Sequence, residues 1–142
     1  MNILVLHGPN LHLLGIREPE VYGKTTLAQL NSRLRAHAKK RELSLKIYQS
    51  NHEGTLIDLL TRHRHWAAGV VINPGALTHY SYALRDAIAG IGLPAVEAHL
   101  SDIKKREPFR RVSVVAPVCA AQIGGKGIGS YLEALDFLAG KG

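Results

Sequence analysis

The sequence is short of sulfur, of aromatic rings and of long apolar runs. Its single cysteine, Cys119, excludes an internal disulfide and suits a reducing cytoplasm. No apolar run approaches the roughly 18–20 residues that a membrane span needs, and no basic leader precedes the first apolar run. Aromatic residues make up 6% of the chain, which offers few stacking platforms for nucleic-acid bases. We therefore expect a cytoplasmic protein with neither a membrane nor a nucleic acid as its partner.

Acidic residues are also scarce. There are 11 Asp and Glu against 18 Lys and Arg, which gives a formal charge of +7. Such an excess suits nucleic acid or an anionic small molecule. The cations form three short clusters, at 39–41, 104–106 and 110–111, rather than a long stripe. The first cluster suits a helix C-terminus, where cations are favoured.

At 142 residues the chain is long enough for one domain with a sizeable core. Five short apolar runs are predicted to be strands, at 3–6, 45–48, 70–72, 95–96 and 112–116. Helical patterns alternate with them, and this alternation predicts a parallel sheet covered on both faces. We expect one flavodoxin-like α/β catalytic domain over residues 1–142, a three-layer sandwich whose five-stranded sheet has the order 2-1-3-4-5.

Three of the helical patterns carry specific expectations. Thr26 and Gln29 form the sequence of a capping box, and so do Ser130 and Glu133. The third helix is predicted to start near Thr78 or His79, to turn Tyr80 inward, and to stop at Gly90 or Gly92.

Sheets of this type bind ligands beyond the carboxyl ends of their strands. The polar residues at those positions follow strands 1, 3 and 4: His7, Asn10, Arg17 and Tyr22, then Asn73 to His79, then Glu97 to Ser101 with Arg106 and Arg110. One site could therefore collect a tyrosine, two histidines, two asparagines and three arginines. The stretch at about 11–25 lacks an apolar period, and loops of that length in compact domains are usually functional or disordered, so we interpret it as an active-site lid.

Two glycine-containing stretches and the histidines resemble phosphate-, dinucleotide- or metal-binding motifs but do not match the residue patterns that those motifs need. Gly23-Lys24-Thr25 resembles the end of a phosphate-binding loop, but Glu18 stands where that motif needs a glycine. The glycine-rich stretch 124–129 misses the dinucleotide spacing and is better interpreted as a turn before the last helix. No histidine lies in an H-E-x-x-H arrangement, so the sequence calls for neither a metal nor another cofactor.

A site rich in Arg and Asn suits an anionic, hydroxyl-bearing substrate. Tyr22 could act as its base if its pKa fell by three units from about 10, which takes about 4 kcal/mol. One guanidinium at ~4 Å supplies about that much at an effective dielectric of 20, and Arg17 or Arg106 could provide it. Each signal taken singly has a structural alternative: Tyr22 as a packing residue, Arg17 as a surface cation, His79 as a helix-capping partner and His99 as a satisfied buried histidine.

Several long motifs together resemble the type II 3-dehydroquinate dehydratase family. They are His7-Gly8-Pro9-Asn10, Leu14 to Gly23 (LGIREPEVYG), Gln49 to Gly54 (QSNHEG), Asn73 to His79 (NPGALTH) and Ala83 to Ala87 (ALRDA). The match runs in order over nearly the whole chain. The resemblance implies dehydration of 3-dehydroquinate through an enolate, without a cofactor, in a dodecamer built from trimers.

The resemblance also implies roles for individual residues. Tyr22 would take the C2 proton, Arg17 would lower the tyrosine pKa, and Asn10 would hold the water that steadies the enolate oxygen. His99 would protonate the departing C1 hydroxyl, and Arg106 would close near the tyrosine. The implied substrate-binding positions are Asn73, His79, Leu100, Ser101 and Arg110, with Asp86 reaching the site of a neighbouring subunit.

This sequence departs from the family pattern mainly after strand 4, where Leu100, Asp102 and Pro108 replace the usual residues. Asp102 adds negative charge near the carboxylate site and Pro108 stiffens the loop, so both could alter affinity or lid motion without changing the reaction. The alternative function is a flavodoxin-like module that binds an anion or nucleotide without catalysis, although no phosphate motif supports it.

Overall fold

A computed structural model of the chain describes residues 1–140, except for the side chains of Val21 and Tyr22. The strands are β1 (Asn2–His7), β2 (Ser44–Gln49), β3 (Gly69–Asn73), β4 (Ala95–Ala98) and β5 (Ala121–Ile123). The helices are α1 (Pro19–Tyr22), α2 (Leu27–Lys40), α3 (Glu53–His63), α4 (Tyr82–Ile91) and α5 (Ile128–Leu138). All strand pairs are parallel and the order is β2-β1-β3-β4-β5, so the predicted topology is confirmed.

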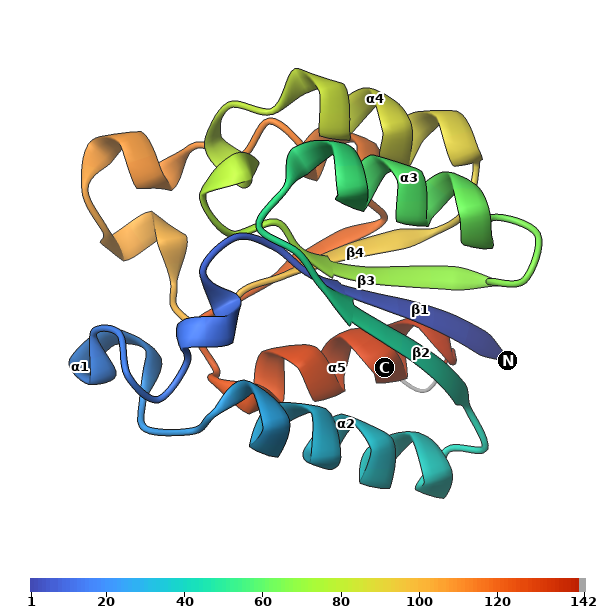
Figure 1. Cartoon of the computed structure of the whole chain (residues 1–142), viewed down its shortest axis with the longest axis horizontal. Coiled ribbons are helices and arrows are strands. Elements are labelled where there is room, and N and C mark those ends of the chain that lie inside the picture. Colours follow the sequence, from blue (N-terminus) through green and yellow to red (C-terminus); the bar gives the residue numbers. More distant parts are fainter. Residues whose placement is uncertain (141–142) are drawn as a thin grey trace.

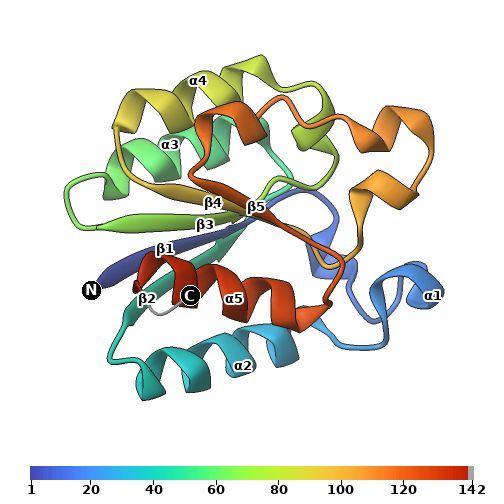
Figure 2. The same ribbon diagram turned by 180° about the vertical axis from the view of Figure 1, so that it is seen from behind.

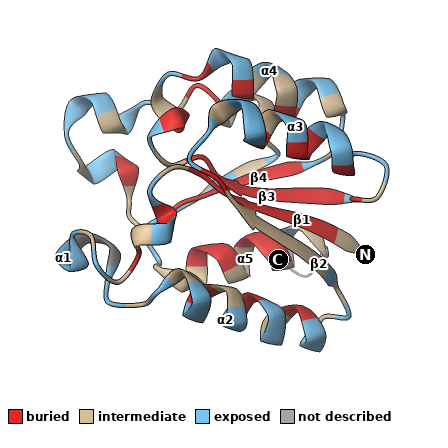
Figure 3. Ribbon diagram, in the orientation of Figure 1, coloured by how far each residue is buried: buried red, intermediate tan, exposed pale blue. Residues whose placement is uncertain are grey.

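The sheet lies between two helical layers. Helices α3 and α4 cover one face, and α2 and α5 cover the other (Figures 1 and 2). Neighbouring residues of a strand point to opposite faces, and β1 divides its side chains in this way. Leu4 and Leu6 join the apolar cluster under α3 and α4, whereas Ile3 and Val5 join the cluster under α2 and α5. The central strands are therefore buried on both faces (Figure 3), as their unbroken apolar sequences require.

Helix α2 begins as predicted. The Thr26 hydroxyl accepts a hydrogen bond from the Gln29 N–H at 3.2 Å, and the Gln29 side chain accepts one from the Thr26 N–H at 3.0 Å. This reciprocal capping box satisfies two of the donors that the first turn leaves without partners. The lid stretch precedes it and holds two short helical segments, a 3-10 helix at Leu11–Leu13 and α1.

The predicted fifth strand at 112–116 is wrong, because β5 lies at Ala121–Ile123. Val114 and Val115 are buried, but they pack into the cluster under α3 and α4 instead of joining the sheet. The Val114 N–H donates to the Thr78 carbonyl at 2.8 Å, and Pro117, which has no N–H, lies in a 3-10 turn at Ala116–Val118. The apolar run therefore marks a buried crossover segment.

Helix α4 starts later than predicted. Residues Gly75–His79 form a 3-10 helix, and Ser81 is the N-cap, with its hydroxyl accepting from the Leu84 N–H at 3.0 Å. Tyr80 consequently lies before the helix and is 62% exposed, so the expectation that it turns inward was wrong. The helix ends as predicted at Gly92, whose φ of 70° is readily adopted by glycine.

Helix α5 starts earlier than the Ser130–Glu133 pattern predicts. Gly127 is the N-cap, and Ser130 is buried within the first turn, where its hydroxyl accepts from the Lys126 N–H at 3.0 Å. Glu133 pairs with the Lys126 ammonium at 2.6 Å instead of closing a capping box. The glycine-rich stretch forms the predicted turn, with positive φ at Gly125 and Gly127. Within residues 1–140, no helix is both long and apolar enough to cross a membrane.

Candidate active site

A cavity of about 200 Å³ opens beyond the carboxyl ends of β1, β3 and β4. The residues that follow these three strands line it, as the switch in strand order between β1 and β3 leads one to expect. The structure brings nine of the predicted site residues to its walls: Asn10, Arg17, Asn73, His79, His99, Leu100, Ser101, Arg106 and Arg110. The polar lining thus combines two asparagines, two histidines, three arginines and Ser101.

Two predicted site residues are not among these nine. Asp86 is exposed on α4 and lies outside the cavity lining of the described residues. Tyr22 ends α1, but its side chain lies outside the described part of the structure.

His99 follows β4 and is held by a buried carboxylate. Its Nε2 lies 2.5 Å from Oε2 of Glu97, two residues earlier. Alternate residues of a strand share a face, which places both side chains on the α3/α4 side of the sheet. Glu97 is fully buried and His99 is 6% exposed. Because the carboxylate binds Nε2, the other ring nitrogen of His99 is the one available to the cavity.

Two hydroxyls complete the surroundings of Glu97. Thr78 donates to its Oε2 at 2.7 Å and Ser113 donates to its Oε1 at 2.7 Å. Burial alone would raise the pKa of Glu97, but the hydrogen bonds from His99, Ser113 and Thr78 and the charge of His99 together lower the Glu97 pKa below its ordinary value. An ionised Glu97 can fix the orientation of the His99 ring and stabilise its protonated form.

The sequence prediction gave no role to Glu97, Thr78 or Ser113. A usable signal existed for Glu97, because an acidic residue two positions before a histidine in an apolar strand must share its face. Nothing in the local sequence pointed to Ser113, since it reaches Glu97 through the crossover segment that was mistaken for a strand. Thr78 lay within a motif of interest, but its hydroxyl was expected near a helix start.

The loops after β1 and β3 are joined by close backbone contacts. The Gly8 N–H donates to the Asn73 carbonyl at 2.7 Å, and a Cβ added at Gly8 would lie 2.5 Å from the Pro74 carbonyl oxygen. Asn10 follows with a left-handed φ of 69°, and its N–H donates to the Asn51 side chain at 3.1 Å. These contacts set the separation between Asn10 and Asn73 in the cavity wall.

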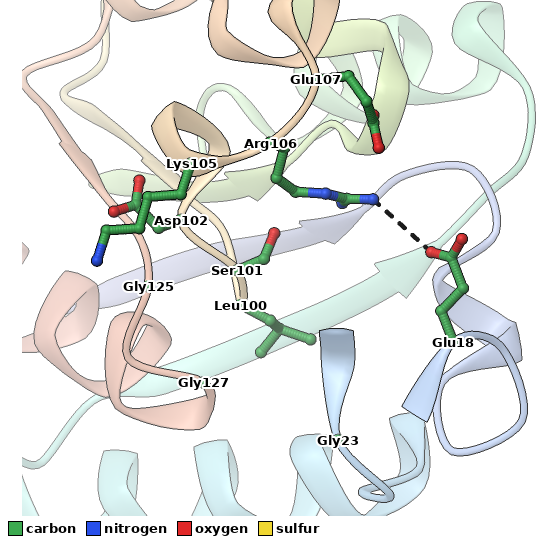
Figure 4. A pocket seen from close by; sticks show the side chains of 10 residues that line it. All are labelled: Glu18, Gly23, Leu100, Ser101, Asp102, Lys105, Arg106, Glu107, Gly125 and Gly127. Atoms are coloured by element: carbon green, nitrogen blue, oxygen red, sulfur yellow. Dashed lines mark ion pairs between the residues drawn. The ribbon is translucent and has the colours of Figure 1, made fainter. Parts of the chain in front are cut away.

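The stretch at 11–25, which the sequence predicts to be a lid, contributes a looser, more exposed arrangement of charges. A carboxylate oxygen of Glu18 lies 3.8 Å from the guanidinium of Arg17. The same oxygen lies 3.7 Å from the guanidinium of Arg106 (Figure 4). The Glu18 side chain is 42% exposed, whereas that of Arg106 is 14% exposed. Glu18 therefore links the stretch at 11–25 to the loop at 102–111.

The remaining polar residues are oriented by their neighbours. His79 donates from Nδ1 to the Val112 carbonyl at 2.7 Å, since a carbonyl can only accept. Arg110 donates to Glu107 at 2.5 Å, and its guanidinium carbon lies 4.7 Å from the ring centre of Phe109. A wider groove of about 720 Å³ adjoins the cavity and shares Leu100, Ser101 and Arg106 with it (Figure 4).

The family model described as dehydroquinase class II matches residues 1–139 of this chain. The chain belongs to the class II dehydroquinase family. It is 54% identical to a 3-dehydroquinate dehydratase of Dictyoglomus turgidum, over 96% of this chain and 94% of that one. It is 56% identical to a 3-dehydroquinate dehydratase of Ruegeria pomeroyi, over 97% and 93% of the two chains. The crystal structure of the type II dehydroquinase from Butyrivibrio crossotus superposes with a TM-score of 0.96 at 45% identity, covering 97% of both chains.

For a class II dehydroquinase, the cavity offers two kinds of chemistry. The Glu97–His99 pair can deliver a proton from a buried, fixed position. The arginines can bind a carboxylate or stabilise negative charge that develops on an oxygen or a phenol. No group of three or more His, Cys, Asp or Glu side chains in the described residues is arranged to hold a metal ion.

Proposed function

We propose that this protein is a type II 3-dehydroquinate dehydratase, a cofactor-independent hydro-lyase of the shikimate pathway to aromatic amino acids. It removes water from 3-dehydroquinate to give 3-dehydroshikimate. The observation that carries this conclusion is that His99, held by the buried Glu97, shares one cavity with three arginines in a chain of this family. A proton donor and a set of cations are what an anti elimination through an anionic intermediate requires.

We assign the first step to Tyr22. Its phenolate would remove the C2 proton of 3-dehydroquinate, and the electron pair of that C–H bond would move onto the C3 oxygen to form an enolate. Arg17 and Arg106 would lower the pKa of the phenol, since a single guanidinium at ~4 Å is worth about 4 kcal/mol at an effective dielectric of 20. Their shared contact with Glu18 supports this, because Glu18 is the N-cap of α1, the helix that ends at Tyr22.

We assign substrate binding to the residues of the cavity floor and walls. Asn10 would hold a water molecule that donates to the enolate oxygen. The substrate carboxylate would lie against the Leu100 backbone and the Ser101 hydroxyl, at the end of β4. Asn73, His79 and Arg110 would bind the substrate hydroxyls, for which amide, imidazole and guanidinium groups are suitable partners.

We assign the second step to His99. The enolate electrons would form the C1–C2 double bond as the C1 hydroxyl departs, and the protonated His99 would donate a proton to it, so that it leaves as water. Glu97 would stabilise the imidazolium before the transfer and hold the ring in place throughout. Tyr22 ends this step protonated and His99 ends it neutral, so exchange with water restores both for the next turnover.

We also propose that the whole chain is one catalytic domain whose lid spans about 11–25, and that the protein acts in the cytoplasm as a dodecamer built from trimers. The exposed position of Asp86 on α4 supports its proposed reach into the site of a neighbouring subunit.

The test is the rise in ultraviolet absorbance as the conjugated enone forms from 3-dehydroquinate in chelator-treated buffer. Tyr22→Phe should reduce turnover by at least about 10³-fold, because it removes the base. Calorimetry should still detect binding of 3-dehydroshikimate to this variant, since the phenol oxygen is not assigned to binding. Full turnover by Tyr22→Phe would rule out the proposed base.

The chemical rival is an imine mechanism through a lysine. Treatment with borohydride in the presence of substrate should leave the wild-type enzyme active, because the proposed route forms no imine. Loss of activity under these conditions, with a mass increase on a lysine, would support the rival.

A further inference from the structure

A row of buried polar side chains runs beneath the cavity, and the reaction steps above do not use most of it. His7 ends β1 and is fully buried. Its Nε2 lies 2.8 Å from Oδ1 of Asn31 on α2, and its Nδ1 lies 3.0 Å from the hydroxyl of Tyr131 on α5. Tyr131 is also fully buried, and the side chain of Asn73, the strand neighbour of His7, lies close enough to the Tyr131 phenol to lower its pKa by hydrogen bonding. Of these four residues, Asn73 is the one that lines the cavity in the described structure.

The sheet itself creates this row. Residues 3, 5 and 7 of β1 point to the face covered by α2 and α5, and so do residues 71 and 73 of β3. Most positions on this face are apolar, with Ile3, Val5 and Val71 in the core cluster. His7 and Asn73 are paired neighbours in the register of the two strands, at the end that borders the cavity. Their polar side chains therefore meet the buried hydroxyl of Tyr131 from adjacent strands.

The donor and the acceptor of each hydrogen bond in this row can be assigned. The Asn31 side-chain oxygen can only accept, so Nε2 of His7 carries a proton. Burial lowers the pKa of His7 to about 4, so at neutral pH the ring is uncharged and Nδ1 is an acceptor. The Tyr131 hydroxyl must then donate to Nδ1 of His7, which leaves the phenol oxygen as the acceptor for Asn73.

The opposite side of the Asn73 amide is fixed as well. Its Oδ1 accepts from the Gly75 N–H at 3.0 Å, so the group turned toward Tyr131 is the amide nitrogen. Burial raises the pKa of the Tyr131 phenol, and the hydrogen bond with Asn73 opposes that rise, as donation from the amide to the phenol oxygen should. An amide rotated by 180° fills the same space, but it would place two acceptors against each other at Tyr131 and two donors at Gly75.

We propose that Asn31, His7 and Tyr131 are positioning residues that hold the Asn73 amide in a single orientation for the substrate. In this orientation Asn73 keeps one N–H and one oxygen lone pair for a substrate hydroxyl. The inference rests on the proposed function, because Asn73 is assigned there to substrate binding. None of the three positioning residues needs to touch the substrate, so their effect on the reaction passes through Asn73.

The first test is a double-mutant cycle on 3-dehydroquinate turnover. Tyr131→Phe keeps the ring and removes the hydroxyl, and it should raise KM about tenfold while kcat stays within about twofold, because ground and transition states lose the same contact. Asn73→Ala should raise KM at least as much. In the Asn73→Ala background, Tyr131→Phe should change KM no further. Multiplied KM effects, or an unchanged KM in Tyr131→Phe, would overturn the proposal.

The second test moves to the far end of the row. Asn31→Ala should raise KM about threefold to tenfold with little change in kcat, although Asn31 lies on α2 outside the cavity lining. Ser32→Ala is the matched control, because Ser32 is an exposed neighbour on the same helix, and it should leave KM unchanged. Equal KM values for the two variants would contradict the proposal.

A third readout is independent of turnover. In 15N-histidine NMR spectra, wild-type His7 should show a protonated Nε2 and an unprotonated Nδ1 at pH 7, and Asn31→Ala should shift both signals. A protonated Nδ1 in the wild-type protein would overturn the positioning row. Failure of wild-type protein to dehydrate 3-dehydroquinate, with the expected His7 tautomer present, would instead reject the proposed function while leaving the hydrogen-bond row intact.

Discussion

Two groups of side chains support the cavity, and they differ in how firmly their neighbours hold them. The acid side consists of Glu97, His99, Thr78 and Ser113, and the arginine side consists of Arg17, Glu18 and Arg106. On the acid side the central carboxylate is fully buried and accepts hydrogen bonds of 2.5–2.7 Å. On the arginine side the central carboxylate is 42% exposed, and its ion pairs measure 3.7 and 3.8 Å.

This difference matches what each part has to do in the proposed reaction. A general acid works best from a fixed position, which a buried and fully hydrogen-bonded carboxylate provides. A lid must open for substrate and close again, and exposed ion pairs of small net energy allow that movement. The comparison therefore predicts large effects on rate and stability from the acid side, and small, salt-sensitive effects from Glu18, the carboxylate of the arginine side.

The largest expected effect comes from Glu97→Gln. We expect kcat to fall about 10³-fold, equivalent to about 4 kcal/mol in the barrier, because a neutral amide cannot stabilise the His99 imidazolium. KM should stay within about threefold of the wild-type value. Steady-state kinetics measured by enone absorbance, with circular dichroism to verify folding, would check this.

Glu53→Gln is the matched control for that substitution. Glu53 accepts a hydrogen bond from Ser81 at 2.5 Å at the start of α3, outside the cavity lining of the described residues. Its kcat should remain close to that of the wild-type enzyme. If Glu97→Gln kept kcat within tenfold of wild type, the acid side would not depend on this carboxylate.

Next in size is an effect of pH on stability through His7. Its folded pKa of about 4 lies below the ordinary 6.5, so the unfolded chain binds the proton first as the pH falls. Stability is thus fully present above pH 6.5 and is lost between 6.5 and about 4, by about 3 kcal/mol in total. Urea unfolding of wild type and His7→Gln at several pH values would measure this, because the variant should lack that part of the loss.

His12→Gln is the control for this pH experiment, since His12 is exposed in the lid. The pH dependence of its unfolding free energy should parallel that of the wild type. Parallel curves for wild type and His7→Gln as well would mean that His7 does not stay neutral when folded.

A smaller loss should follow Thr78→Val. The valine has nearly the same shape, but the buried Glu97 loses one donor, so we expect the free energy of unfolding to fall by about 2 kcal/mol. Thr61→Val is the comparison, because Thr61 donates to the Ile57 carbonyl on the exposed side of α3. That variant should change stability by less than about 0.5 kcal/mol. Similar losses in the two variants would remove the distinction between buried and exposed hydroxyls.

The smallest effect should come from Glu18→Gln on the arginine side. We expect KM to rise about twofold at low salt, with little change in stability, because exposed ion pairs contribute little. The difference from wild type should disappear at about 0.5 M salt, where screening is strong. Glu20→Gln, an exposed lid variant, should show no such change. A large, salt-independent loss in Glu18→Gln would place the arginine side among the rigid parts of the site.

Much of the fold could be predicted because local pattern and global topology agree. Strand–helix alternation gave the parallel sheet and its order, and Thr26 with Gln29 gave the start of α2. The prediction failed where tertiary contacts overrode local pattern. Val114 and Val115 look like a strand but pack beneath helices, and Ser130 looks like a cap but is buried within the first turn of α5.

The residues that line the candidate site could be predicted from the sheet topology, but the residues that support them could not. The rule that ligands bind beyond the carboxyl ends of parallel strands selected the asparagines, histidines and arginines that line the cavity. It could not select the groups that support them. Ser113 reaches Glu97 only through the path of the crossover segment. The row from Asn31 to Asn73 joins two helices and two strands.

The close approach at Gly8 has a consequence for engineering this enzyme toward bulkier substrates. Even a single methyl group there would meet the Pro74 carbonyl at 2.5 Å, so libraries that vary positions 8 or 73–75 should return mostly misfolded clones. Diversity is better introduced at Asp102 and Lys105, in the wide groove that already adjoins the cavity.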